Sequence, residues 1–158
     1  RIELVCLTDL FGIATHAAGA TETREGIDIL SVVEGKDKPR EWLVGYYGEP
    51  GTPQFKVMVR DIRWKYIFIA NGGREQLFDL RSDPCELKNA IGAKLQIAAS
   101  LRKIAVSACS VPGTEGALDN KSLRAFAYKE REYKRIYQFD LSRGITGFPA
   151  KPEDVLKT

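Results

Sequence analysis

The segment from residue 41 to residue 81 constrains the fold of this chain more than any other part. It holds four short runs of β-branched and aromatic residues, separated by connections of only a few residues. The run at 55–60 alternates apolar and polar side chains, as a half-buried strand does. Asn71-Gly72-Gly73 is typical of a tight hairpin turn. Because short connections join antiparallel neighbours, we predict a four-stranded antiparallel sheet over 41–81.

Apolar residues at helical spacing predict helices on both sides of this sheet in the sequence. Asp83-Pro84-Cys85-Glu86 has the residue types of a helix start, with a capping carboxylate and a proline at the first helical position. The predicted helices cover 5–18, 84–109 and 121–137, and the Gly- and Pro-containing tail at 139–158 is predicted to be irregular. The expected architecture is therefore α+β: a small four-stranded antiparallel sheet packed against C-terminal helices, forming one domain over 1–138.

The charge and hydropathy of the chain argue against two classes of partner. Among the 158 residues, 24 Lys and Arg oppose 21 Asp and Glu, which gives a net charge of only +3. The dense charge run at 129–135 has mixed signs, whereas nucleic-acid binders concentrate positive charge in a patch or stripe. No apolar run has the length that a membrane span needs. We therefore expect neither a nucleic acid nor a membrane as partner.

Three cysteines, Cys6, Cys85 and Cys109, are widely separated, and no pair has the CxxC spacing of a zinc or redox site. We interpret them as small buried apolar groups. Their odd number leaves a thiol unpaired, which favours a reducing, cytoplasmic compartment. The chain starts at Arg1 in what reads as the middle of an element, so we expect a fragment whose own N-terminus and any signal peptide are missing.

Several motifs, taken together, resemble one enzyme family. Their order and spacing over roughly 4–90 are similar to the C-terminal part of the sulfatases of the arylsulfatase, formylglycine-dependent type. The strand pair of that family appears in Met58-Val-Arg-Asp-Ile-Arg-Trp-Lys-Tyr-Ile67 and Gln76-Leu-Phe-Asp-Leu80, followed by Asp83-Pro-Cys-Glu-Leu-Lys-Asn89. Upstream, the matching elements are Thr8-Asp-Leu-Phe11 with Gly19, and Glu25-Gly-Ile-Asp-Ile-Leu30. The segment 126–155 resembles a tail of some bacterial sulfatases, so a bacterial protein is expected.

Three positions depart from the family pattern. Gly12 and Ile13 stand where its helix usually has Pro-Thr, and Ile62 replaces the usual turn glycine. The resemblance implies a small sheet and helix docked on a larger α/β catalytic domain of the same polypeptide. It also implies that the parent enzyme cleaves sulfate esters with a formylglycine nucleophile and a calcium ion, both located upstream of this chain.

The sequence itself contains no recognisable set of those catalytic groups. No Cys or Ser begins a C/S-x-P/A-x-R motif; Ser110-Val-Pro-Gly-Thr114 lacks the arginine, and no adjacent Asp pair is present for calcium. His16 is the only histidine and has no second histidine with which to form a relay. We therefore predict no catalytic residue, no metal site and no cofactor in this chain, and we predict that it is inactive by itself.

Substrate contacts are a separate question, because the resemblance implies that this subdomain borders the substrate cleft. Tyr46, Tyr47, Glu49, Arg60 and Arg143 are the candidate substrate-binding residues, since they suit the hydroxyls and anions of a sulfated sugar. For each there is a structural alternative: the tyrosines as one core and one surface residue, and Arg60 paired with Asp61 or Asp79.

Two other functions remain open from the sequence. The chain could be a stand-alone carbohydrate- or protein-binding module, or the same subdomain of a phosphonate or phosphodiester hydrolase relative. If it is a detached subdomain, its docking face should expose apolar side chains and promote a homo-oligomer. We expect that face on the outer side of the sheet, at Trp64 or Phe68.

Overall fold

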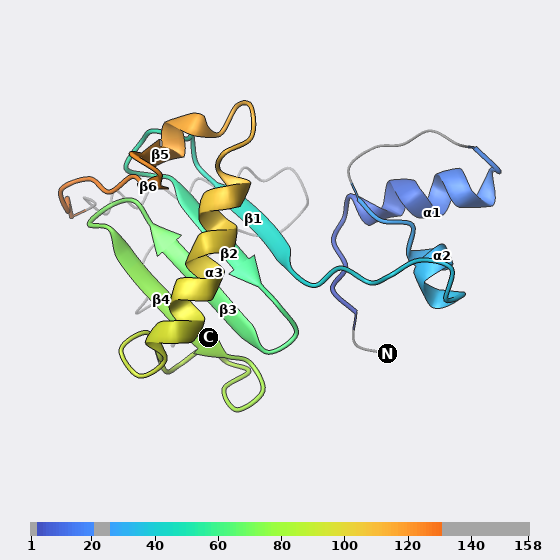
Figure 1. Cartoon of the computed structure of the whole chain (residues 1–158), viewed down its shortest axis with the longest axis horizontal. Helices are drawn as coiled ribbons and strands as arrows, with labels where there is room; N and C mark the ends of the chain where they lie inside the picture. The colour runs from blue at the N-terminus through green and yellow to red at the C-terminus, as the bar shows by residue number, and fades with distance from the viewer. Residues whose placement is uncertain (1–2, 21–25, 131–158) are drawn as a thin grey trace, which may run out of the picture.

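The central element of the computed structural model, which describes residues 3–20 and 26–130, is a four-stranded antiparallel sheet (Figure 1). Its strands follow one another in sequence order. They are β1 (Leu43–Tyr47), β2 (Lys56–Arg60), β3 (Trp64–Ile69) and β4 (Arg74–Asp79). The predicted antiparallel sheet within 41–81 and the α+β class are confirmed.

One face of the sheet is covered by α3 (Leu95–Ala108), which crosses it diagonally in Figure 1. Along β3 every second side chain is buried, so the strand alternation predicted from the sequence is present in full. Val57, Val59, Tyr66, Phe68 and Leu77 meet Ala98, Leu101 and Ala105 of the helix in one core. The small alanines allow the helix backbone to approach the large side chains of the sheet closely.

The helix predicted over 84–109 begins only at Leu95, so its first part was wrong. Glu86 has a φ of 57°, which no α-helix accommodates. The Asp83 carboxylate accepts hydrogen bonds from the backbone N–H groups of Leu87 and Lys88, at 3.1 and 2.8 Å, and so closes a loop. Asn89 then accepts a bond from Leu77 N at 2.9 Å. The polar side chains that look like a helix cap instead fasten a loop to the edge of β4.

The helix predicted over 121–137 is also wrong where the structure describes it. A 3₁₀ turn, η1 (Glu115–Ala117), leads into a small hairpin of β5 (Leu118–Asp119) and β6 (Ser122–Leu123). Asn120 and Lys121 form its turn with φ values of 46° and 66°. Phe126 then forms a parallel bridge with Asn71. Positions 131–137 and the tail at 139–158 lie outside the described residues.

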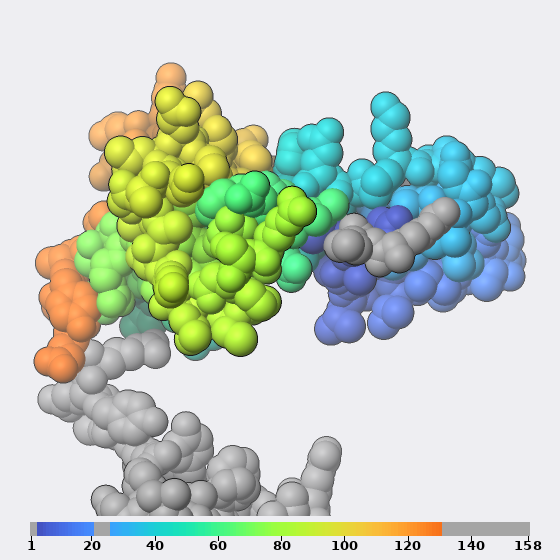
Figure 2. Space-filling view, turned by 90° about the horizontal axis from the view of Figure 1, so that it is seen from below, coloured from blue at the N-terminus to red at the C-terminus, as the bar shows by residue number. Residues whose placement is uncertain are grey.

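Two helices form a separate unit beside the sheet, which we call the α1–α2 unit (Figures 1 and 2). They are α1 (Asp9–Ala17) and α2 (Ile29–Val33), so the helix predicted over 5–18 starts four residues later. Gly12 lies against the other segment: a Cβ there would be 2.7 Å from the Ile27 carbonyl oxygen. None of the helices within 3–20 and 26–130 has the length and hydropathy to cross a membrane.

A buried ion pair holds the α1–α2 unit together. The Asp9 side chain is fully buried, and the Arg40 guanidinium donates a hydrogen bond to each of its carboxylate oxygens, at 2.7 and 2.6 Å. The same carboxylate accepts bonds from Cys6 N and Ile27 N, at 2.7 and 2.9 Å. One side chain therefore joins three chain segments, and the bond to Arg40 is the main reason that the pKa of Asp9 lies well below its usual range.

The prediction of an exposed apolar face on the sheet is also wrong. Trp64 and Phe68 are 8% and 5% exposed, because both point to the face that α3 covers. Large apolar side chains are exposed instead on and before α1, where Val5, Leu7 and Leu10 are 53%, 84% and 59% exposed.

Candidate functional site

The structure places the candidate substrate-binding residues at different points of the sheet. Tyr46 and Tyr47 are neighbours in β1 and therefore lie on opposite faces. Glu49 is exposed in the connection between β1 and β2. Arg60 ends β2, opposite Leu43 and far along the strand from Tyr47. Arg143 lies outside the described residues. The four described candidates therefore do not form one site.

Tyr46 contacts the core layer. It faces the α3 side of the sheet, where its hydroxyl donates to the Ala108 carbonyl at 3.0 Å and its ring stacks on Phe55. These contacts link β1 to the end of α3. Although Tyr46 is still 48% exposed, its hydroxyl is engaged in a bond that fixes the helix on the sheet.

Arg60 was expected, as a structural alternative, to pair with Asp61 or Asp79. Asp79 pairs instead with Arg63, whose Nη2 is 2.8 Å from the carboxylate. Asp61 uses Oδ1 to accept bonds from Arg63 N and Trp64 N, which closes the turn between β2 and β3. The Ile62 position therefore needs no glycine, because the aspartate side chain stabilises the turn.

Tyr47, the fourth described candidate, borders a group of basic side chains on the other face of the sheet. The register places Tyr47 beside Lys56, Lys56 beside Ile69, and Ile69 beside Arg74, in one row across all four strands. Next to this row is a cavity of about 340 Å³. We call the residues that line it the basic corner: Pro53, Gln54, Lys56, Ile69, Asn71, Arg74, Lys129 and Glu130.

The basic corner is assembled from two distant parts of the chain. Asn71, in the turn between β3 and β4, donates through Nδ2 to the Lys129 carbonyl and accepts through Oδ1 from Lys129 N, both at 2.8 Å. This pair of bonds continues the bridge between Asn71 and Phe126. Gly72 and Gly73, with φ values of 85° and 58°, make the turn that presents Asn71 in this way.

Aromatic rings support two of the basic side chains. Lys56 Nζ lies 5.2 Å from the centre of the Tyr47 ring, and the Arg74 guanidinium lies 5.1 Å from that of Tyr128. Arg74 also donates through Nε to the Asn71 carbonyl at 3.1 Å. In the described part of the chain, Lys56, Arg74 and Lys129 form no ion pair with a carboxylate, whereas Arg40, Arg63, Lys65 and Arg102 each have one.

Sequence reasoning missed Lys56, Arg74 and Lys129. Arg74 could have been found from the hairpin register, since Asn71-Gly72-Gly73 fixes which residues of β3 and β4 are opposite. Lys56 needs the register of β2 on β3 as well. Lys129 could not be found from the sequence, because a helix was predicted over 121–137. The chain instead returns to the turn between β3 and β4, where Lys129 bonds to Asn71.

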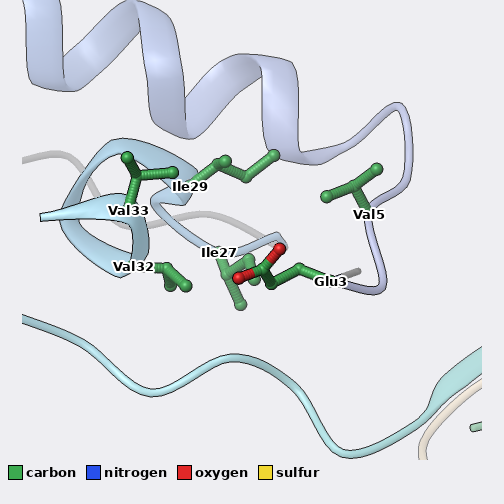
Figure 3. A pocket seen from close by; sticks show the side chains of 6 residues that line it. All are labelled: Glu3, Val5, Ile27, Ile29, Val32 and Val33. Carbon is green, nitrogen blue, oxygen red and sulfur yellow. The ribbon is translucent and has the colours of Figure 1, made fainter. Parts of the chain in front are cut away.

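A second hollow, of about 210 Å³, lies in the α1–α2 unit (Figure 3). Its walls are aliphatic, from Val5, Ile27, Ile29, Val32 and Val33, and Figure 3 shows the Glu3 carboxylate at its edge. Leu7 and Leu10 are exposed on and before the neighbouring helix. The unit therefore combines an apolar hollow with exposed apolar side chains.

The single histidine of the chain has a structural partner. His16 Nδ1 lies 2.6 Å from Asp28 Oδ2, and Asp28 also caps α2 by accepting from Leu30 N and Ser31 N. Bonds from Ser31, and then from His16, lower the pKa of Asp28 to about 2. No set of three or more Cys, His, Asp and Glu side chains within 3–20 and 26–130 could hold a metal ion.

The three cysteines are free, and they differ in environment. Cys109 is buried, as predicted, and burial raises the pKa of its thiol to about 11. Cys6 is partly buried and Cys85 is exposed, so the prediction of a buried apolar role is wrong for Cys85. Its exposure follows from the loop that replaces the predicted helix.

Comparison with known proteins relates this chain to one class of enzyme. No protein-family model matches it. The choline-sulfatase of Rhizobium meliloti (strain 1021) is 34% identical over 83 residues, which are 52% of this chain and 15% of that enzyme. A candidate sulfatase from Bacteroides thetaiotaomicron VPI-5482 has 26% identity and a TM-score of 0.58, over 75% of this chain and 26% of its own.

A solved 2-O GAG sulfatase gives the same score and identity, over 75% of this chain and 27% of that one. The chain thus spans only about a quarter of the solved structures and a smaller share of the choline-sulfatase. These comparisons establish a relationship to the sulfatases. They confirm the predicted resemblance to the C-terminal part of such an enzyme, with an α+β fold and bacterial relatives.

Proposed function

We propose that this chain is the non-catalytic C-terminal portion of a sulfatase, a sulfuric ester hydrolase. It completes the core of the parent enzyme and borders the substrate cleft. The observation that carries the proposal is the extent of the match: 75% of this chain aligns with about a quarter of a sulfatase structure. In this proposal the formylglycine nucleophile and the calcium ion belong to the catalytic domain of the same polypeptide.

The surface of the α1–α2 unit supports the first part of the proposal. Leu7 is 84% exposed and Leu10 is 59% exposed. The same unit has an aliphatic hollow, which Val5 and Val33 help to line (Figure 3). Soluble proteins seldom leave such side chains together in water unless another surface covers them. The catalytic domain would bury this surface, and in its absence a second copy of the chain would do so.

The basic corner supports the second part of the proposal. Relatives of this chain include a choline-sulfatase and a 2-O GAG sulfatase. A sulfate ester as the substrate of the parent enzyme fits a cleft wall that carries cations, since sulfate oxygens accept charge-assisted hydrogen bonds from Lys and Arg. Tyr47, a predicted substrate-binding residue, stands at the edge of this corner.

The proposal predicts that the purified chain releases no product from 4-nitrophenyl sulfate in the presence of calcium. A sulfatase known to be active, assayed in parallel, verifies the conditions. The measurement is the absorbance of 4-nitrophenol against chain concentration. Saturable release that grows in proportion to the amount of this chain would rule out a non-catalytic role.

A further inference from the structure

We propose that Asn71 is a site of self-modification, where the side chain deamidates to aspartate or isoaspartate once residues 126–129, the returning segment, leave it. Asn71 precedes Gly72, whereas the other two asparagines of the chain, Asn89 and Asn120, precede alanine and lysine. A following glycine favours this reaction because no side chain hinders its backbone nitrogen, which is the nucleophile. The inference does not depend on the proposed function.

The reaction needs no reagent other than water. The backbone nitrogen of Gly72 gives its proton to the solvent and bonds to Cγ of Asn71, while the bond from Cγ to Nδ2 breaks and ammonia leaves. Water then opens the resulting succinimide ring, at one carbonyl to give aspartate and at the other to give isoaspartate, whose backbone runs through Cβ. Asn71 is half-buried and Gly72 is exposed, so solvent reaches the site.

In the folded chain the returning segment holds both reacting groups. The Asn71 side chain donates through Nδ2 to the Lys129 carbonyl and accepts through Oδ1 from Lys129 N, both at 2.8 Å. Gly72 N donates to the Phe126 carbonyl at 3.0 Å, and Phe126 N donates to the Ala70 carbonyl at 2.9 Å. The attack requires Gly72 N and the Asn71 side chain to leave these bonds together. Deamidation therefore waits for a local opening of the returning segment.

The modification makes the opening permanent. Both products lack Nδ2, which is the donor to the Lys129 carbonyl. Aspartate places a carboxylate oxygen against that carbonyl oxygen, where neither atom can donate a hydrogen bond. Isoaspartate adds an atom to the backbone of the turn between β3 and β4, and so changes the position from which the side chain reaches the returning segment. The site thereby converts a reversible opening of the returning segment into an irreversible one.

The test is peptide mass spectrometry of the full chain after incubation at mildly alkaline pH, in buffer and in guanidinium chloride. We expect Asn71 to deamidate at least about tenfold more slowly in the folded than in the unfolded wild type. Phe126→Pro/Lys129→Pro lacks both backbone N–H donors of the returning segment and should react at close to the unfolded rate. The matched control, Phe126→Leu/Lys129→Ala, keeps both donors and should react within about threefold of the folded wild type.

Circular dichroism verifies that the variants keep the sheet, since the returning segment lies outside its four strands. The comparison of folded and unfolded wild type stands even if a variant does not fold. Equal rates at Asn71 in those two states would overturn the inference, as would a folded proline variant that reacts no faster than its control. In the unfolded chain Asn71 must also react faster than Asn120, which precedes lysine; equal rates there would rule out the site.

Hydrogen exchange tests whether the opening is permanent. A wild-type chain whose Asn71 is converted in guanidinium chloride, and which is then refolded, should exchange the amide hydrogens over 126–129 at least about tenfold faster than a chain refolded at once. Equal exchange in the two refolded chains would show that the returning segment docks again after the modification, contrary to the proposal.

Discussion

Asp9→Asn will unfold the α1–α2 unit while the sheet stays folded. The substitution removes the negative charge to which Arg40 donates two hydrogen bonds. It also places an amide NH₂ or a weaker acceptor against Cys6 N and Ile27 N. Breaking one side of a buried ion pair leaves the other charge uncompensated and costs about 3 kcal/mol or more. A unit of two short helices has too small a core to absorb such a loss.

The measurement is amide hydrogen exchange, followed by mass spectrometry. Exchange over 9–17 and 29–33 should approach that of an unfolded chain, while exchange in β3 should match the wild type. Glu34→Gln is the matched control, because it removes the carboxylate of an exposed pair with Lys36 at the end of the same unit. Exchange over 9–17 that Asp9→Asn leaves unchanged would refute the role given to this ion pair.

Acid titration of the wild-type chain gives a second readout of the Asp9–Arg40 pair. The bond to Arg40, and then those from Cys6 N and Ile27 N, hold the pKa of Asp9 well below its ordinary 3.8. The stability that this carboxylate contributes is therefore fully present above the ordinary value and is lost as the pH falls below it. The wild-type α1–α2 unit should lose exchange protection as the pH falls from about 4 to 2.

Leu77→Ala will destabilise the other unit, the sheet with α3, by about 3 kcal/mol. Leu77 has no exposed surface and lies in the core between β4 and α3, beside Tyr66. Its removal leaves a cavity that a close-packed interior cannot fill without moving Tyr66 or the helix. The free energy of unfolding in urea, followed by tryptophan fluorescence, measures the effect.

Leu87→Ala is the control for that experiment, because it makes the same change in the loop after β4. Leu87 is 82% exposed, so its loss should change the free energy of unfolding by less than about 0.5 kcal/mol. Equal effects at the two positions, or a loss below about 1 kcal/mol at Leu77, would be incompatible with the described core.

The sheet was predictable because its signals are local. Alternation at 55–60 and the Asn71-Gly72-Gly73 turn both act within a few residues, and the structure has both. The loop at 84–94 was not predictable, because Asp83 serves a capped helix and a closed loop equally well. Whether a helix or a loop forms depends on Asn89, which accepts a hydrogen bond from the backbone of β4 at Leu77. Asn89 and Leu77 are too far apart in the sequence for a local pattern to indicate this bond.

The candidate site was harder to predict than the fold, because it is formed by contacts between residues that are distant in the sequence. Tyr47 was identified from its residue type and its place near a loop, and it does stand beside the basic corner. The corner itself needs Asn71 and Lys129, 58 residues apart, to be joined by two hydrogen bonds. In the same way, no local pattern indicates the Asp9–Arg40 pair, because its two members are 31 residues apart.

The central claim is that this chain is one part of a larger enzyme, whose remainder covers the apolar surface at Leu7 and Leu10. Sedimentation equilibrium over a wide range of chain concentration tests it most directly. We expect the wild-type chain to self-associate through that surface, and Leu7→Ser/Leu10→Ser to stay monomeric with unchanged exchange in the sheet. A wild-type chain that remains a monomer at every concentration would contradict the claim.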